Sequence, residues 1–274
     1  METDKDPDMA GNSVSAALEW TAPGEDRVTV TVPDAETLLA SLSERIDAGE
    51  GFAVATLNLD HAVKLKRDPA FAAAYAAHTH ITADGNPVVW LSRIAGQRDV
   101  RLVPGSELIE PVAALAAEKG VPLGLFGATE ASLTAAGDAL EVAHPGLRVP
   151  LRLAPPMGFD PDGPEALAAI DAIGQSGVRV VFLALGAPKQ ERFAARAFAA
   201  LPHVGFLSIG AGLDFVSGAQ TRAPKAVRGM AGEWLWRLAG SPRRLGPRYA
   251  ACLAALAGLT GRALATRRRA ARGA

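Results

Sequence analysis

The sequence predicts an α/β fold, a Rossmann-like and mostly parallel sheet with helices on both faces, followed by a small basic helical appendage. β-like segments alternate with helix-like segments from residue 25 to about residue 220, as expected for parallel strands joined by crossover helices. Residues 178–185 form a continuous apolar run, which is typical of a strand whose two faces are both covered. We therefore expect one α/β domain over residues 25–220.

The elements follow from hydrophobic periodicity and from helix-terminal residues. Residues 28–32 alternate as a strand, and Pro33 and Asp34 then begin a helix that reaches about residue 48, just before Gly49. Further strands are predicted at residues 52–57, around Ile81, and at 121–126, 147–153, 178–185 and 204–209. One of the intervening helices begins at Thr129.

The two ends of the chain differ from this pattern. Residues 1–24 are polar, acidic and poor in large apolar residues, so we expect a disordered extension. Residues 221–274 predict a basic helical appendage, with helices at 224–237 and from 249 to about 269 and a break at 241–244. From Arg222 onward there are 12 Lys and Arg residues and a single acid, Glu233. Such a tail is typical of an interaction surface for anionic lipid, nucleic acid or a partner protein.

Two features bear on the compartment. The longest uncharged run near the end, residues 249–261, has 13 residues and by that measure is too short to span a bilayer. Cys252 is the single cysteine, which fits a reducing compartment. We therefore expect a soluble or peripheral cytoplasmic protein.

Polar residues follow two of the early predicted strands. Thr56 and Asn58 lie at one strand end, and ligands of doubly wound sheets bind beyond the carboxyl ends of strands. Alternatively, Asn58 or Asp60 caps the next helix. Asp84 also follows a strand, where its carboxylate either caps a helix or accepts a proton from a hydroxyl. General-base catalysis of that kind contributes about 10²- to 10⁴-fold to a rate.

The loops after the later strands carry small and polar residues. The turn Gly127-Ala128 precedes a helix whose first N–H groups could bind phosphate, or it is only a turn. Pro188, Lys189 and Gln190 begin a helix directly after a buried strand, which indicates ligand contact.

The glycine-rich segment of residues 208–218 is the last of these loops. Gly210 and Gly212 permit close approach of a ligand, and Asp214 could bind ribose hydroxyls. Phe215 occupies the third glycine position of the dinucleotide fingerprint, so that motif is absent.

The pair Asp160 and Asp162 has the spacing of a glycosyltransferase metal motif. It lies in a segment rich in Pro and Gly, where turn formation explains it better. We predict no metal site and no cofactor.

Taken together, the loops resemble the WecG/TagA/CpsF glycosyltransferase family over roughly residues 56–248. The blocks that carry the resemblance are Thr56-x-Asn58-x-Asp60-His61, Ala83-Asp84-Gly85-x-Pro87-Val88-Val89, Val103-x-Gly105-Ser106-Glu107-Leu108, Leu125-Phe126-Gly127-Ala128, Pro155-Pro156-x-Gly158-Phe159, Leu185-Gly186-x-Pro188-Lys189-Gln190-Glu191, Gly210-Ala211-x-x-Asp214-Phe215-x-Ser217-Gly218, Arg222-Ala223-Pro224 and Glu233-Trp234-x-x-Arg237. Each block alone is weak, and their order and spacing together are specific.

The resemblance implies an inverting, metal-independent transfer of a sugar, often N-acetylmannosamine, from a UDP-sugar. The implied acceptor is a sugar on undecaprenyl diphosphate, in the synthesis of teichoic acid, capsule or other surface polysaccharide. It also implies a peripheral position on the cytoplasmic face of the membrane, with the appendage contacting anionic lipid. We expect no nucleic acid partner, and homo-oligomerisation stays open.

The resemblance also suggests roles for individual residues. Asp84 is similar to the proposed catalytic base of the family, Thr56, Asn58 and Gln190 to residues lining the site, and Asp214 to a nucleotide contact. The remaining candidates are Gly127, Ala128, Pro188, Lys189, Gly210 and Gly212 for the nucleotide-sugar, and Arg101, Arg237, Arg244 and Arg248 for diphosphate or membrane.

Two other functions fit the α/β pattern. An NAD(P)-dependent oxidoreductase would share the sheet, although the glycine fingerprint is missing. A non-catalytic nucleotide-binding regulator with a basic tail would bind UDP without turnover.

Overall fold

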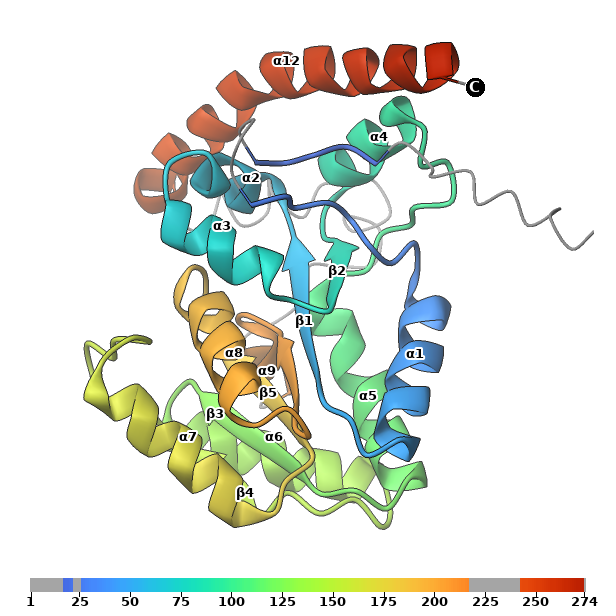
Figure 1. The fold of residues 1–274 in the computed structure, drawn as a ribbon. Coiled ribbons are helices and arrows are strands. Elements are labelled where there is room, and N and C mark those ends of the chain that lie inside the picture. Colours follow the sequence, from blue (N-terminus) through green and yellow to red (C-terminus); the bar gives the residue numbers. More distant parts are fainter. Residues whose placement is uncertain (1–16, 22–25, 217–241, 274) are drawn as a thin grey trace, which may run out of the picture.

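The computed structural model describes residues 17–21, 26–216 and 242–273 (Figure 1). They contain one six-stranded sheet in the order β2-β1-β6-β5-β3-β4, and every neighbouring pair is parallel. The strands are β1 (Phe52–Leu57), β2 (His80–Ala83), β3 (Leu123–Gly127), β4 (Leu151–Leu153), β5 (Val180–Ala184) and β6 (Gly205–Ser208). The helices are α1 (Ala35–Asp47), α2 (Leu59–Leu65), α3 (Pro69–Ala76), α4 (Asn86–Ala95), α5 (Gly105–Glu118), α6 (Glu130–Ala143), α7 (Pro164–Ser176), α8 (Lys189–Ala200), α9 (Gly212–Val216) and α12 (Pro242–Gly273). The predicted α/β fold with a parallel sheet is confirmed.

Residues 28–32, predicted as a strand, do not form one. Val28, Val30 and Val32 are buried, so the predicted alternation of burial is present. However, the backbone N–H groups of Thr31 and Val32 both donate to the carbonyl of Ile81, and the Ile81 N–H donates to the Thr31 hydroxyl. The Thr31 hydroxyl takes the place of a backbone carbonyl as the acceptor for Ile81, so residues 28–32 run along β2 without forming the hydrogen-bond ladder of a strand.

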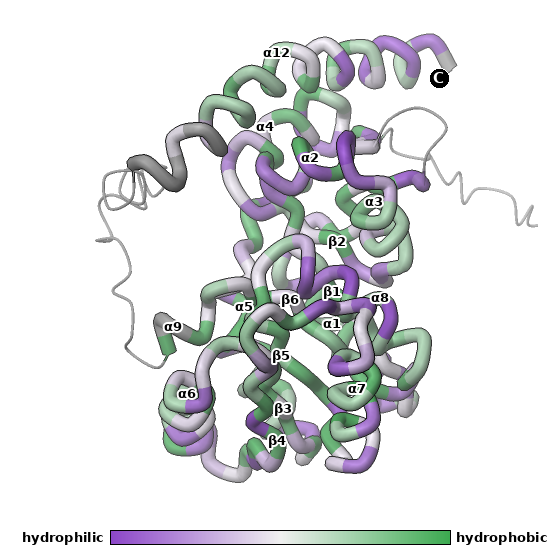
Figure 2. Tube along the Cα trace, turned by 90° about the vertical axis from the view of Figure 1, so that its left-hand side faces the viewer, coloured by the Kyte–Doolittle hydropathy of each residue, from purple (hydrophilic) through white to green (hydrophobic). Residues whose placement is uncertain are grey.

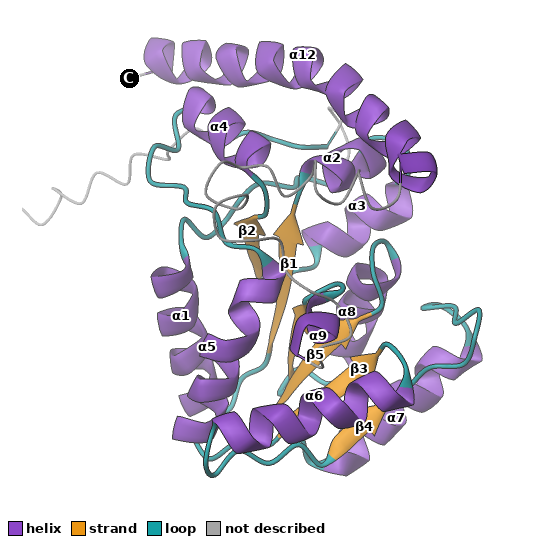
Figure 3. Cartoon of the chain, turned by 180° about the vertical axis from the view of Figure 1, so that it is seen from behind, coloured by secondary structure: helices purple, strands orange, loops and turns teal. Residues whose placement is uncertain are grey.

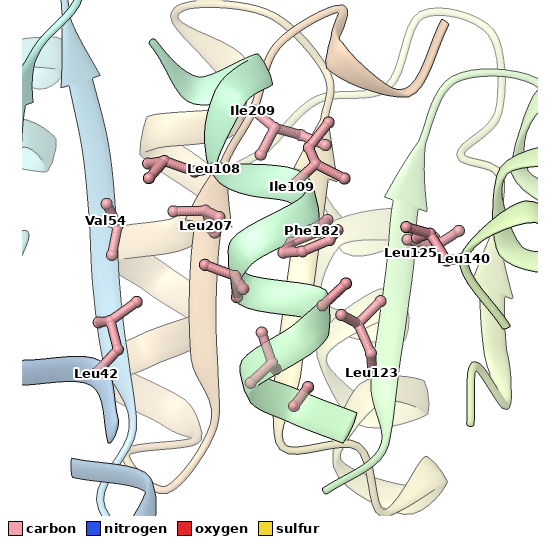
Figure 4. Packing of buried hydrophobic residues seen from close by; sticks show 14 of the residues in the cluster. Leu42, Val54, Leu108, Ile109, Leu123, Leu125, Leu140, Phe182, Leu207 and Ile209 are labelled. Carbon is pink, nitrogen blue, oxygen red and sulfur yellow. The ribbon is translucent and has the colours of Figure 1, made fainter. Parts of the chain in front are cut away.

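Helices cover both faces of the sheet, as the views from opposite sides show (Figures 1 and 3). One face packs against α1, α5 and α6, and its central contact is α5 over β1, β6, β5 and β3 (Figure 4). Leu108 and Ile109 of α5 meet Leu207 of β6 and Phe182 of β5 in this cluster. The opposite face packs against α7 and α8 around Phe193.

A second cluster at the β2 side joins α2, α3, α4 and α12 to β1 and β2. Leu18 and Trp20 belong to it and are fully buried. The prediction that residues 1–24 are disordered is therefore wrong for residues 17–21, because Trp20 offers a large apolar side chain that the acidic composition of the segment obscured. Residues 1–16 and 22–25 lie outside the described part of the chain.

The final helix differs from its prediction. α12 begins at Pro242, where a break was expected, and continues to Gly273. Proline is compatible with the first turn of a helix, because the N–H that it lacks has no intrahelical partner there. α12 packs on α4 and α2, with Leu259 and Ala263 buried in the shared cluster, and Cys252 of the same helix is buried as well. The predicted helix at 224–237 lies outside the described residues.

Residues Tyr249–Arg272 of α12 are long and apolar enough to cross a membrane by length and composition alone, since an 18-residue stretch within them has a mean hydropathy of 1.2. The uncharged run of 13 residues is shorter than this apolar segment because the run ends before Arg262, whereas the segment continues past that single charge. The Arg262 guanidinium donates to the carbonyls of Glu19 and Thr21. Figure 2 shows hydrophilic residues gathered at the carboxyl end of the helix.

Candidate active site

The carboxyl ends of β2, β1, β6 and β5 bring most of the predicted residues to one edge of the sheet. The Asp84 N–H donates to the carbonyl of Leu57 at 2.8 Å, which fixes the end of β2 beside the end of β1. The Ile209 N–H likewise donates to the carbonyl of Leu183 at 3.0 Å and joins β6 to β5. The loops carrying Asp84, Asn58, Gly210 and Gln190 therefore follow neighbouring strands.

Three glycine turns leave this edge open. Gly85, Gly186 and Gly210 follow β2, β5 and β6 with φ angles of 104°, 73° and 58°. A Cβ atom built on Gly186 or Gly210 would meet no atom within 4 Å, and one on Gly85 would meet only Pro87 Cδ at 3.9 Å. These residues are glycine because of their left-handed backbone, and no other part of the described structure crowds the side-chain positions beside them.

Asp84 is not the residue that caps α4. That helix begins at Asn86, and its N-cap is Gly85, which has no side chain. The alternative explanation of Asp84 as the cap of this helix is therefore wrong. Asp84 is half-buried, and its charge is close enough to Tyr75 to help raise the pKa of that hydroxyl.

Asn58 does cap its helix, so the structural alternative is confirmed for this residue. Its Oδ1 accepts the His61 N–H of α2 at 3.0 Å. The neighbouring Asp60 instead pairs with Lys64 at 2.7 Å. Capping uses one lone pair of the Asn58 amide oxygen and leaves its NH₂ group facing His61 Nε2 at 3.3 Å.

A directed chain of hydrogen bonds lies beneath Thr56 and Asn58. Burial raises the pKa of Tyr75 well above its usual range, and the charges of Glu191 and Asp84 add to the effect. The hydroxyl therefore keeps its proton and donates it to the Thr56 carbonyl at 3.1 Å. His61 Nδ1 lies 2.7 Å from the same hydroxyl and must donate to it, which leaves Nε2 to accept from Asn58. Thr56 itself is buried.

Gln190 is buried and bonded at both ends of its amide. Its Oε1 accepts the Gly210 N–H at 3.0 Å, and its Nε2 donates to Glu191 Oε1 at 2.8 Å. Gln190 thus joins the start of α8 to the loop after β6. Lys189 Nζ donates to the Phe159 carbonyl at 2.7 Å, and Pro188 is the N-cap of α8.

Glu191 is a further candidate, beyond the residues that the sequence predicts for the site. It is fully buried at the start of α8, and burial raises its pKa to about 7, partly offset by the hydrogen bond from Gln190 and the charge of Lys64. The sequence offered one signal, an acid at the buried start of a helix beside Gln190.

The turn after β3 has a strained backbone. Ala128 has a φ of 54°, which is uncommon for a residue with a side chain. A Cβ on Gly127 would lie 2.5 Å from the Ala184 carbonyl oxygen, so this position requires glycine. Thr129 caps α6 by accepting the Ser132 N–H. The turn therefore presents the start of α6 at the same edge of the sheet, beyond β5.

Two other glycines serve packing. A Cβ on Gly105 would lie 3.0 Å from the Ser208 carbonyl oxygen, so glycine lets α5 begin against the end of β6. A Cβ on Gly212 would lie 2.7 Å from Ile109 Cδ1. The sequence predicts that glycine at position 212 makes room for a ligand. In the structure, its lack of a side chain makes room for α5.

Arg101 lies away from this network. It is exposed, and its guanidinium donates to the carbonyls of Arg98 and Asp99. Asp214 lies in α9, and Arg244 and Arg248 lie in α12, but their side chains are outside the described part of the structure, as is all of Arg237.

Asp160 forms a turn as predicted, because its Oδ1 accepts the Asp162 N–H at 3.0 Å. The Asp162 carboxylate pairs with Arg192.

The edge thus combines a half-buried carboxylate, the buried amide of Gln190 and the half-buried amide of Asn58, open glycine turns and a helix start. Such a set can accept a proton, orient hydroxyls and receive an anion. A model of the glycosyl transferase WecG/TagA/CpsF family matches residues 27–271, which is most of the chain and includes every strand. The chain therefore belongs to the WecG/TagA/CpsF family of glycosyl transferases.

Proposed function

We propose that the protein transfers N-acetylmannosamine or a related sugar from a UDP-sugar to a sugar on undecaprenyl diphosphate. Membership of a glycosyl transferase family supports sugar transfer. The observation that carries the proposal for this chain is the position of Asp84. It follows β2, its N–H is bonded to the end of β1, and the N-cap position of α4 belongs to Gly85.

In the proposed reaction, Asp84 accepts the proton of the acceptor hydroxyl. The hydroxyl oxygen forms a bond to the anomeric carbon while the bond from that carbon to the β-phosphate oxygen breaks. The bonding electrons leave with UDP from the opposite face, so the anomeric configuration inverts. Asn58 and Thr56 lie next to Asp84 along the edge and would orient the reacting sugars.

The leaving diphosphate gains negative charge and needs positive partners. The start of α6 after Gly127-Ala128 presents backbone N–H groups and the positive end of a helix dipole. The proposed metal-independent reaction would add arginines of the appendage, residues 221–274, with Arg237, Arg244 and Arg248 as candidates. The loops of Gly210 and Lys189 would hold the nucleotide, with Asp214 on the ribose.

We also propose that the protein sits peripherally on the inner face of the cell membrane. Leu253 and Leu264 of α12 are exposed, 63% and 42% respectively. Arg267, Arg268 and Arg269 follow on the same helix and are exposed as well. Basic side chains near anionic lipid contribute about 1 kcal/mol each, and the acceptor lipid would bring the site to the membrane.

The function is tested by measuring UDP release from a panel of UDP-sugars, with a short-chain lipid-diphosphate sugar as acceptor. We expect release that requires both the acceptor and one preferred UDP-sugar. Omission of the acceptor serves as the control for hydrolysis. UDP binding without acceptor-dependent release would favour a regulator and would refute the proposed transfer.

A further inference from the structure

Gln190 has a determined orientation, because the Gly210 N–H can only donate. The amide atom that faces it at 3.0 Å must therefore be the oxygen, and the NH₂ group must face Glu191 at 2.8 Å. An acceptor is required at that position. The Glu191 carboxyl oxygen supplies it in either protonation state, since a proton can reside on Oε2.

The position of Glu191 has no packing explanation. Its side chain is fully buried, and within the described residues its Oε2 has no hydrogen-bond partner. A buried carboxyl group with an unpaired oxygen destabilises a fold, and an apolar side chain of similar shape would pack there at lower cost. Besides the charges of Lys64 and Asp60 nearby, what distinguishes Glu191 from such a residue is its hydrogen bond with Gln190.

The loop at the other end of this chain of contacts takes one of its hydrogen bonds from Gln190. Gly210 follows β6 with a left-handed φ of 58° and open space beside it. Its N–H is held by the Gln190 side chain. Two residues later, the Gly212 N–H closes a turn onto the carbonyl of Ile209. The conformation of the turn at Gly210 is therefore set in part from α8.

We propose that Glu191 is a positioning residue that acts through Gln190 to hold the Gly210 turn in the conformation that binds the uridine nucleotide. The inference rests on the proposed function, in which the Gly210 loop contacts the nucleotide. It assigns Glu191 to donor binding, whereas Asp84 acts on the acceptor.

The test compares Glu191→Leu, which fills the space without an acceptor, with Glu191→Gln, which restores an amide oxygen. Hydrogen exchange of the Gly210 amide reports the turn directly. We expect exchange about fivefold faster in Glu191→Leu, the effect of losing one hydrogen bond, and wild-type exchange in Glu191→Gln. Leu91→Ala, in the cluster that joins α2, α3, α4 and α12 at the β2 side of the sheet, controls for a general loss of stability.

The second readout is nucleotide affinity and turnover. In Glu191→Leu, the Kd for UDP and the KM for the UDP-sugar should rise about fivefold, with kcat nearly unchanged. Unchanged Gly210 exchange in Glu191→Leu, or an equal defect in Glu191→Gln, would overturn the proposal. Faster exchange with unaltered UDP affinity would overturn it too.

The proposed function fails in a distinguishable way. A wild-type protein that binds no uridine nucleotide would refute that function, and the role of Glu191 in holding the turn would then be decided by Gly210 exchange alone.

Discussion

Replacing Glu191 with Gln should make the stability of the protein less sensitive to pH. Burial raises the Glu191 pKa from 4.5 to about 7 in the folded state. Between these values the unfolded chain loses the proton while the folded chain retains it, so wild-type stability falls as the pH rises from about 4.5 to 7. The cost is then constant above pH 7. Integrated from pH 5 to 8, it amounts to about 2 to 3 kcal/mol.

Urea unfolding followed by circular dichroism at pH 5 and pH 8 measures this difference. The free energy of unfolding of Glu191→Gln minus that of wild type should be larger at pH 8 than at pH 5, by the same amount of about 2 to 3 kcal/mol. Glu36→Gln is a matched control, because Glu36 also lies in the first turn of a helix but is exposed. A Glu191→Gln variant that tracks wild type at both pH values would refute the buried-carboxyl argument.

The other predictions concern packing, a buried histidine and the membrane. Gly105→Ala should destabilise the fold by about 1 to 3 kcal/mol, because its Cβ would press on the Ser208 carbonyl. Gly258→Ala in α12 meets no atom and should instead stabilise the protein by about 1 kcal/mol in thermal unfolding. Burial lowers the His78 pKa to about 4, so the stability advantage of wild type over His78→Gln should shrink as the pH falls from 6.5 towards 4 in urea titrations, and a constant difference would contradict this. Changing Arg267, Arg268 and Arg269 to Gln should weaken binding to anionic vesicles about 100-fold, with neutral vesicles as the control; unaltered binding would exclude these residues from a membrane contact.

The order of strands and helices could be predicted because mainly apolar segments, of which residues 178–185 are the clearest, alternate with helical segments and polar turns. The strand at 52–57 was located to the residue. The failure at residues 28–32 has a local cause, since the Thr31 hydroxyl takes a backbone position that alternation alone does not reveal. The early start of α12 was missed because Pro242 reads as a break but is compatible with the first turn of a helix.

Loop residues at strand ends were predictable as a group, because parallel strands end at one edge. Their individual partners were not. Asn58 and Asp60 are two residues apart in the sequence, and the structure alone shows that Asn58 is the cap. The sequence does not predict Glu191 as a site residue, because its burial depends on how α8 packs against α3. The two helices are far apart in the sequence.

The role of Asp84 is the central claim, and one measurement tests it most directly. Acceptor-dependent UDP release is compared for wild type, Asp84→Asn and Asp171→Asn, a control at an exposed carboxylate of α7. Asp84→Asn should lower kcat by about 10²- to 10⁴-fold, because an amide cannot accept the proton, while UDP affinity stays within about twofold of wild type. Asp84→Asn with near-wild-type release would contradict the assignment of Asp84 as the base.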